Sequence, residues 1–153
     1  MLFISDVYQI QGLWFPSVRV YIFGNYESEP CGTDSYSHGC WPTILAWLST
    51  PSIKQCCVIM EGDRVYQKTF LLQLYTITDG TLQILQMESA EPEKTKRKQL
   101  RGQNEQWLRS RETICTNILA IPQFDVTICY STCEEDINHF VEYMKNILEI
   151  NPS

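Results

Sequence analysis

The sequence predicts an α+β fold: a mostly antiparallel sheet with a core meander, and a central helix and a C-terminal amphipathic helix packed on it. The main observation is a β-patterned block from Ser52 to Met87. Turn residues at 61–63 and 78–80 divide this block into three candidate strands. The length of 153 residues predicts a single domain over residues 1–153.

Composition restricts the classes of function. The chain is 44% hydrophobic and 20% charged, as expected of a globular protein, and its net charge of −6 argues against broad binding to nucleic acid or anionic membranes. No apolar stretch is long enough to predict a membrane span. The start of the chain lacks the basic region of a signal peptide, and an odd count of seven cysteines favours reduced thiols. We therefore expect a nuclear or cytoplasmic protein without a cofactor.

The first third of the chain contains short candidate elements. Residues 2–15 predict a short helix that ends near Gly12, followed by an aromatic turn over residues 12–16. Val18 to Phe23 predicts a strand, and the Gly-, Pro- and Ser-rich residues 24–41 predict a loop. Pro42 fits the first turn of a short, buried helix that ends at Leu48.

The β-patterned block supplies the predicted core. Cys56 to Met60 is continuously apolar, which predicts a central strand covered on both faces. The next segment, Arg64 to Ile77, shows apolar and polar residues in alternation and predicts a half-buried strand. Residues 82–87 predict the third strand. The charged residues 88–104 then predict a mobile, solvated loop.

The last third of the chain has the clearest patterns. A helix is predicted from Gln103 to Leu119, and a strand from Phe124 to Tyr130. Thr132 and Glu135 have the spacing of a capping box that opens the final helix. One apolar stripe runs along this helix, and we expect its burial to dock the helix on the sheet; it consists of Ile137, Phe140, Val141, Met144, Ile147 and Leu148.

Catalytic and metal chemistry is only weakly indicated. Cys31, His38 and Cys40 fall in one loop, but their spacing is not that of a zinc site, so loop and core cysteines are the preferred interpretation. Cys133 opens a helix, which favours the thiolate, but the neighbouring carboxylates oppose this effect. His139 lies six residues further on, on the far side of the helix from the apolar stripe, so no Cys–His pair is expected.

A basic run is a candidate for nuclear targeting or for contact with an anion; it consists of Lys94, Lys96, Arg97, Lys98 and Arg101. Short basic runs are also common on solvated loops, so the pattern is unspecific. Trp14, in the predicted aromatic turn, is a candidate interface anchor.

The order of elements resembles the HORMA domain of Mad2 and Rev7 proteins. The similarity lies in the aromatic-proline turn at 12–16, in a core hairpin formed by 53–59 and 68–72, and in the helix, proline and strand over 109–130. The resemblance implies a protein-binding module whose central helix contributes a basic residue to dimer contacts, and Arg111 is the nearest match. Few residues follow Tyr130, so the resemblance implies a fixed heterodimer or an edge-strand contact instead of closure around a peptide.

The preferred function is thus a non-enzymatic adaptor subunit that binds another protein in a nuclear or cytosolic complex. The resemblance suggests chromosome, meiotic, checkpoint or DNA-repair assemblies. The candidate interface residues are Trp14, Arg109, Arg111, Asp125 and Thr127. A PH-like domain that uses the basic run for an anionic ligand is the alternative among binding modules. A cysteine- or metal-dependent enzyme is the alternative of another class.

Overall fold

The computed structural model describes residues 2–5, 10–27, 32–91, 95–96, 102 and 104–150, with the backbone alone for 2–5 and 149–150. Contacts gather in two compact units, Met1–Thr81 and Leu82–Asn151. Both units contain helices and strands. The strands of the first unit form a mixed, mostly antiparallel sheet, and those of the second unit form a small parallel sheet. The predicted α+β class is confirmed.

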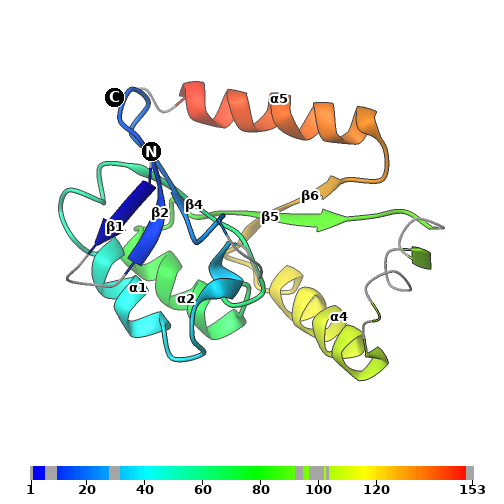
Figure 1. The fold of residues 1–153 in the computed structure, drawn as a ribbon. Helices are drawn as coiled ribbons and strands as arrows, with labels where there is room; N and C mark the ends of the chain where they lie inside the picture. The colour runs from blue at the N-terminus through cyan, green and yellow to red at the C-terminus, as the bar shows by residue number, and fades with distance from the viewer. Residues whose placement is uncertain are drawn as a thin grey trace. The chain divides into compact units, whose positions relative to one another are not determined.

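The first unit is built on a four-stranded sheet in the order β1-β2-β3-β4 (Figure 1). Its strands are β1 (Leu2–Ser5), β2 (Ile10–Phe15), β3 (Val20–Phe23) and β4 (Cys57–Met60). The β1–β2 and β2–β3 pairs are antiparallel, whereas β3 and β4 run parallel. A parallel pair needs a crossover connection, which the segment containing α1 provides.

The N-terminal segment forms strands, so the predicted helix over residues 2–15 is wrong. Gly12 explains part of the difference, because a Cβ at this position would lie 2.5 Å from the carbonyl oxygen of Ile22. The glycine marks a close backbone approach in a strand instead of a helix end. The predicted aromatic turn over 12–16 is also wrong, since residues 12–15 belong to β2 and the chain turns over residues 16–19.

The first helix, α1 (Trp41–Leu48), confirms the prediction of a short buried helix. Ile44, Trp47 and Leu48 are buried. The Trp47 ring lies 5.3 Å from the ring centroids of both Tyr21 and Phe23 in β3. These contacts place α1 against one face of the sheet.

The predicted meander is wrong at its second strand. Residues 68–77 form the helix α2 (Lys68–Ile77), which buries Phe70, Leu71 and Leu74. Positions i, i+1 and i+4 lie on one side of a helix, so the apolar residues fit a helical face as well as a strand. β4 is formed as predicted, but it lies at the edge of the sheet and its residues are half-buried, so it is not a covered central strand.

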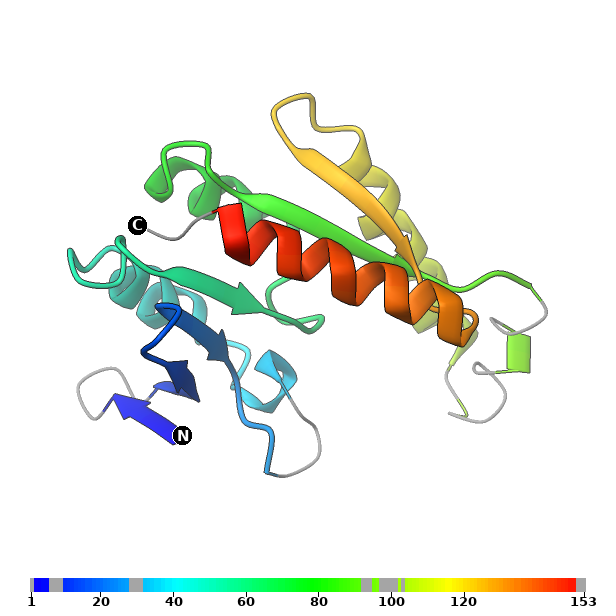
Figure 2. The same ribbon diagram turned by 90° about the horizontal axis from the view of Figure 1, so that it is seen from above.

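The core of the first unit lies between the sheet and its two helices, which pack side by side (Figure 2). Phe70 of α2 is completely buried, and its ring centroid lies 5.6 Å from that of Trp41 in α1. The Trp41 indole donates its Nε1 hydrogen to the carbonyl of Arg64 at 2.8 Å. The aromatic rings therefore connect both helices to the loop that precedes α2.

Two glycines allow the backbone at residues 24–25 and at residue 32 to approach closely after β3. Asn25 and Gly32 form an isolated antiparallel bridge, with N–H···O distances of 3.2 and 2.7 Å. Gly24 has a φ of +129°, and a Cβ there would lie 2.4 Å from the carbonyl carbon of Gly32. The amide of Thr33 donates to the carbonyl of Glu61 at 3.0 Å, which fixes this loop against the end of β4.

The second unit contains β5 (Gln83–Glu88), α4 (Glu105–Leu119), β6 (Asp125–Tyr130) and α5 (Glu134–Ile150). The predicted strand at 82–87, the helix over 103–119, the strand over 124–130 and the final helix are thus confirmed as elements. β5 pairs with β6 in parallel, not with a meander strand. The helices α4 and α5 lie on opposite faces of this sheet (Figures 1 and 2).

The observed strand pairing changes one prediction from the sequence. The parallel pairs β3–β4 and β5–β6 replace the predicted antiparallel meander, and the PH-like alternative stays a prediction. Most of the charged segment 88–104 lies outside the described residues, apart from 88–91, 95–96, 102 and 104. Among the residues that are described, no helix combines the length and the apolar character needed to cross a bilayer.

Candidate interaction surface

Exposed apolar side chains are concentrated in the second unit. Within the described part of the chain, the large apolar residues with exposed side chains in this unit are Met87, Trp107, Leu119, Ile128, Tyr130, Ile137 and Val141. In the first unit they are Phe15, Val18 and Tyr26. Single exposed apolar residues are normal, whereas several on one element indicate a surface that can bind another protein.

One face of the β5–β6 sheet carries α5. The hydroxyl groups of Thr127 in β6 and Tyr143 in α5 lie 3.3 Å apart in a hydrogen bond. Because side chains alternate along a strand, Asp125 and Cys129 point to the same face as Thr127. Met87 is paired with Cys129 and therefore belongs to this face too, with 46% of its surface exposed.

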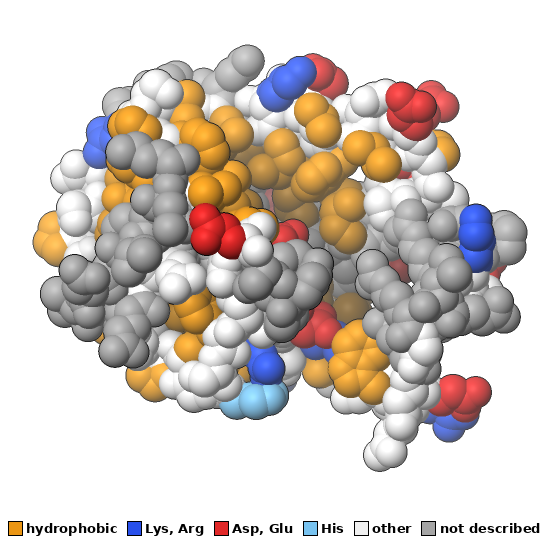
Figure 3. All heavy atoms as spheres, in the orientation of Figure 1, with side chains coloured by type: hydrophobic (Ala, Val, Ile, Leu, Met, Phe, Trp, Pro, Cys, Tyr) orange, Lys and Arg blue, Asp and Glu red, His pale blue; other side chains and the backbone are white. Residues whose placement is uncertain are grey.

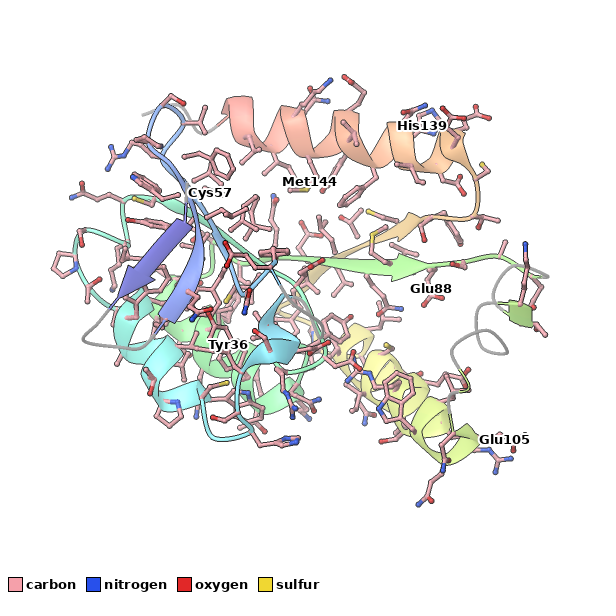
Figure 4. The ribbon with its side chains drawn as sticks, in the orientation of Figure 1. Tyr36, Cys57, Glu88, Glu105, His139 and Met144 are labelled. Atoms are coloured by element: carbon pink, nitrogen blue, oxygen red, sulfur yellow. The ribbon has the colours of Figure 1, made fainter. Side chains whose placement is uncertain are left out.

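The final helix docks on the sheet as predicted, but its apolar stripe is only partly covered. None of its described side chains is classed as buried, and Ile137 and Val141 are 50% and 42% exposed. In Figure 4, Met144 points from the side of α5 that faces the sheet and His139 points from the opposite side. We define the α5 strip as Ile137, Val141, Met144 and Leu148, of which Ile137 and Val141 are exposed and Met144 and Leu148 are half-buried.

Acidic residues outnumber basic ones on α5. The helix contains five acidic residues and a single lysine, and three of the acidic residues occupy its first turn. The lysine, Lys145, already lies 2.6 Å from a carboxylate oxygen of Glu142. Figure 3 shows red acidic side chains at the amino-terminal end of α5 beside orange apolar ones. The helix as a whole therefore has a net negative charge.

The start of α5 is capped by Asp136. Its Oδ2 accepts hydrogen bonds from the backbone amides of Thr132 at 2.9 Å and Cys133 at 3.2 Å. The predicted capping box is therefore wrong: among the described residues no amide donates to the Glu135 carboxylate, and the Thr132 hydroxyl accepts from the Ala90 amide at 2.8 Å. The bond from Thr132, followed by that from Cys133, holds the pKa of Asp136 below its ordinary value.

This cap gives a testable pH dependence. A depressed pKa in the folded state means that the cap stabilises α5 above the ordinary aspartate pKa and is lost as the pH falls through the folded value. We expect the amide NMR shifts of Thr132 and Cys133 to titrate with a midpoint below 3.8, the ordinary value for this aspartate. Asp136→Ala should abolish the titration, whereas Glu135→Ala should leave it unchanged. A midpoint at or above the ordinary value would contradict the cap.

The predicted interface residues fall in different places. Trp14 is in β2 of the first unit, where its ring stacks on that of Tyr21 at 4.0 Å, so it is not the exposed anchor of a turn. Arg109 pairs with Glu105 at 3.7 Å on the exposed side of α4, and Arg111 is half-buried on the same helix. Only Asp125 and Thr127 are brought together, on the α5 face of β6.

The basic run contributes little to the described surface. Lys96 is exposed. The other four members, Lys94, Arg97, Lys98 and Arg101, lie outside the described residues. A role in targeting or in anion binding therefore stays a prediction.

The structure describes His38, Cys40, Cys133 and His139 among the cysteine and histidine candidates. Cys31 lies outside the described residues, and the imidazole of His38 contacts the guanidinium of Arg64. Burial raises the pKa of the Cys40 thiol, which keeps it protonated and weakens it as a nucleophile. Across the described ranges, no group of three His, Cys, Asp or Glu residues is placed to hold a metal ion.

Comparison with family models, with curated proteins and with solved structures gives no match. The HORMA resemblance therefore stays a prediction. Its third part is formed, because α4, Pro122 and β6 follow one another as expected. Its core hairpin is not formed, because residues 68–72 begin α2.

Proposed function

We propose that this protein is a non-enzymatic interaction module, an adaptor subunit that binds a partner protein through the α5 strip. The observation that carries the proposal is that Ile137 and Val141, on the apolar face of α5, are exposed. Full burial of an aliphatic side chain of this size is worth about 1.5–3 kcal/mol, and roughly half of that remains available at each position. A partner that covers the strip would recover this energy.

The cell compartment and the assembly belong to the same proposal. We place the protein in a nuclear or cytosolic complex. The resemblance to the HORMA domain suggests chromosome, meiotic, checkpoint or DNA-repair assemblies as the setting. The residues that would bind the partner are, in this proposal, those of α5 together with the neighbouring face of β6, to which Asp125 and Thr127 belong.

A double variant tests the proposal. Ile137→Gln with Val141→Gln removes the apolar surface and keeps residues that are compatible with a helix. We expect affinity capture from cell extract, quantified by mass spectrometry, to lose its specific partners by about tenfold or more, which corresponds to about 1.4 kcal/mol. Circular dichroism checks that the fold is retained.

The matched control is Val18→Gln. Val18 is 55% exposed in the turn between β2 and β3 of the first unit, so the substitution makes the same chemical change away from α5. The control should capture the same proteins as the wild type. The proposal fails if the double variant also captures them undiminished.

A further inference from the structure

The strand β6 has an outer backbone edge. Within the described ranges it pairs with β5 alone, in a two-stranded parallel sheet (Figure 2). The amide of Ser131 donates to the carbonyl of Glu88 at 2.9 Å, and in a parallel ladder every second residue bonds to the neighbouring strand. The amides and carbonyls of Val126, Ile128 and Tyr130 therefore point away from β5.

This edge lacks the features by which natural proteins prevent pairing between exposed strands. Such features are lysine or proline on the edge, a bulge, or a very short strand. β6 has six residues, Asp125–Tyr130, and none of them is proline, glycine, lysine or arginine. All six are in continuous register with β5, so the strand has no bulge. The edge is thus suited to receive another strand.

The apolar side chains beside the edge are exposed. Ile128 and Tyr130 lie on the sheet face opposite Thr127, which is the face that carries α4. They are 44% and 52% exposed, so α4 leaves them largely uncovered. A strand added at this edge would bring cross-strand neighbours against both side chains.

The residues of β6 are complementary to an antiparallel copy of the same strand. When Ile128 lies opposite its own copy, Val126 lies opposite Tyr130 of the other copy, and the outward backbone groups at all three positions pair. Pairs of β-branched and aromatic side chains stabilise such strands. Asp125, the one charged residue of β6, then lies opposite Ser131. A parallel pair in the matching register would instead bring two aspartates together.

We propose that two copies of this chain associate through β6, in an antiparallel β6–β6 pair centred on Ile128. The two small sheets then become one continuous sheet of four strands. A two-fold axis relates the copies, which is the commonest symmetry of homodimers. The proposal goes beyond the proposed function, because it uses the edge of β6 and not the α5 strip.

Analytical ultracentrifugation of the full chain, from about 1 to 100 μM, tests the proposal. We expect an equilibrium between monomer and dimer. Tyr130→Lys should raise the Kd of the dimer at least about tenfold, because an edge lysine opposes strand pairing. Met87→Lys is the matched control, since Met87 is 46% exposed but belongs to β5. It should leave the Kd unchanged.

Ile128→Pro tests the backbone contacts directly. Proline has no amide hydrogen, but the Ile128 amide points away from β5, and an edge strand tolerates proline at such a position. We expect the dimer to be lost while circular dichroism shows a retained fold. If this variant does not fold, the comparison of Tyr130→Lys with Met87→Lys still decides the proposal.

A disulfide cross-link tests the register. Residues opposite each other in a hydrogen-bonded antiparallel pair have Cα atoms about 5.5 Å apart, which is within the range of a disulfide. Ile128→Cys should therefore give a covalent dimer on mild oxidation, seen on a non-reducing gel. Met87→Cys should give no more dimer than the wild type.

The contrary outcomes are equally defined. A chain that stays monomeric at the highest concentration overturns the proposal. So does a dimer that withstands Tyr130→Lys and Ile128→Pro but dissociates with Ile137→Gln and Val141→Gln, because that result assigns the association to the α5 strip. A dimer that Tyr130→Lys dissociates but that Ile128→Cys does not cross-link overturns the register centred on Ile128. Loss of captured partner proteins from the α5 variant bears on the proposed function alone.

Discussion

Phe70→Ala is expected to lower the free energy of unfolding by about 3–5 kcal/mol, the usual cost of removing a completely enclosed phenylalanine. The side chain is fully buried and its ring lies against Trp41, so the substitution leaves a cavity between α1 and α2. Domains of this size have total stabilities of about 5–15 kcal/mol, so the loss is a large fraction of the whole. Urea denaturation followed by tryptophan fluorescence measures it.

Phe15→Ala is the matched control for this prediction. Phe15 ends β2 and is 39% exposed, so its removal creates no enclosed cavity. We expect a loss of about 1 kcal/mol or less, as for most surface substitutions. Similar losses for the two variants would show that Phe70 does not have the structural role assigned to it.

Gly24→Ala is expected to cost about 3–5 kcal/mol. The backbone there has a φ of +129°, which only glycine adopts readily, and strain of this kind costs about 1–3 kcal/mol. The added Cβ would also lie 2.4 Å from the backbone of Gly32, so the two segments must separate. Separation disrupts the two hydrogen bonds between Asn25 and Gly32, each worth about 1 kcal/mol.

Gly39→Ala separates this effect from the general consequence of replacing glycine. A Cβ at Gly39 meets no atom within 4 Å. The substitution is expected to change stability by less than about 1 kcal/mol, because it only restricts the unfolded chain. Thermal denaturation of the two variants side by side gives the comparison, and equal shifts in Tm would refute the role of Gly24.

The second unit was largely predictable as a set of elements. In α5 the apolar residues from Ile137 to Leu148 keep one helical period over about three turns, and in β6 the alternation of Val126, Ile128 and Tyr130 is regular. Local periodicity of this length overrides other signals. Periodicity shows which face of an element is apolar, but it does not show whether another element covers that face. Ile128 and Tyr130, for example, are 44% and 52% exposed.

The first unit was harder to predict because its elements are short. Residues 68–77 have apolar side chains at 70, 71, 72, 74 and 77, a density that satisfies both a two-residue and a 3.6-residue period. Because this segment was predicted as a strand, the alternation of strands and helices from β3 through α1, β4 and α2 to β5 was not recognised. That alternation is the signal for parallel pairing, and it would have predicted the β3–β4 and β5–β6 pairs.

The candidate site was predictable only in part. The sequence identified the stripe of α5 and selected Asp125 and Thr127, which share a face of β6. It also selected Trp14, whose stacking on Tyr21 depends on the β2–β3 register. Register is set by long-range pairing and is not encoded in the neighbours of a residue.

The two parallel pairs have a consequence for how fast the protein reaches its native state. Val20 pairs with Cys57, and Gln83 with Asp125. Each pair joins positions separated by roughly forty residues, so a large loop must close before either pairing contributes stability. Refolding should therefore be slow in comparison with helical proteins of this length, and the edge of β3 that pairs with β4, together with β5, would stay exposed to aggregation during that delay.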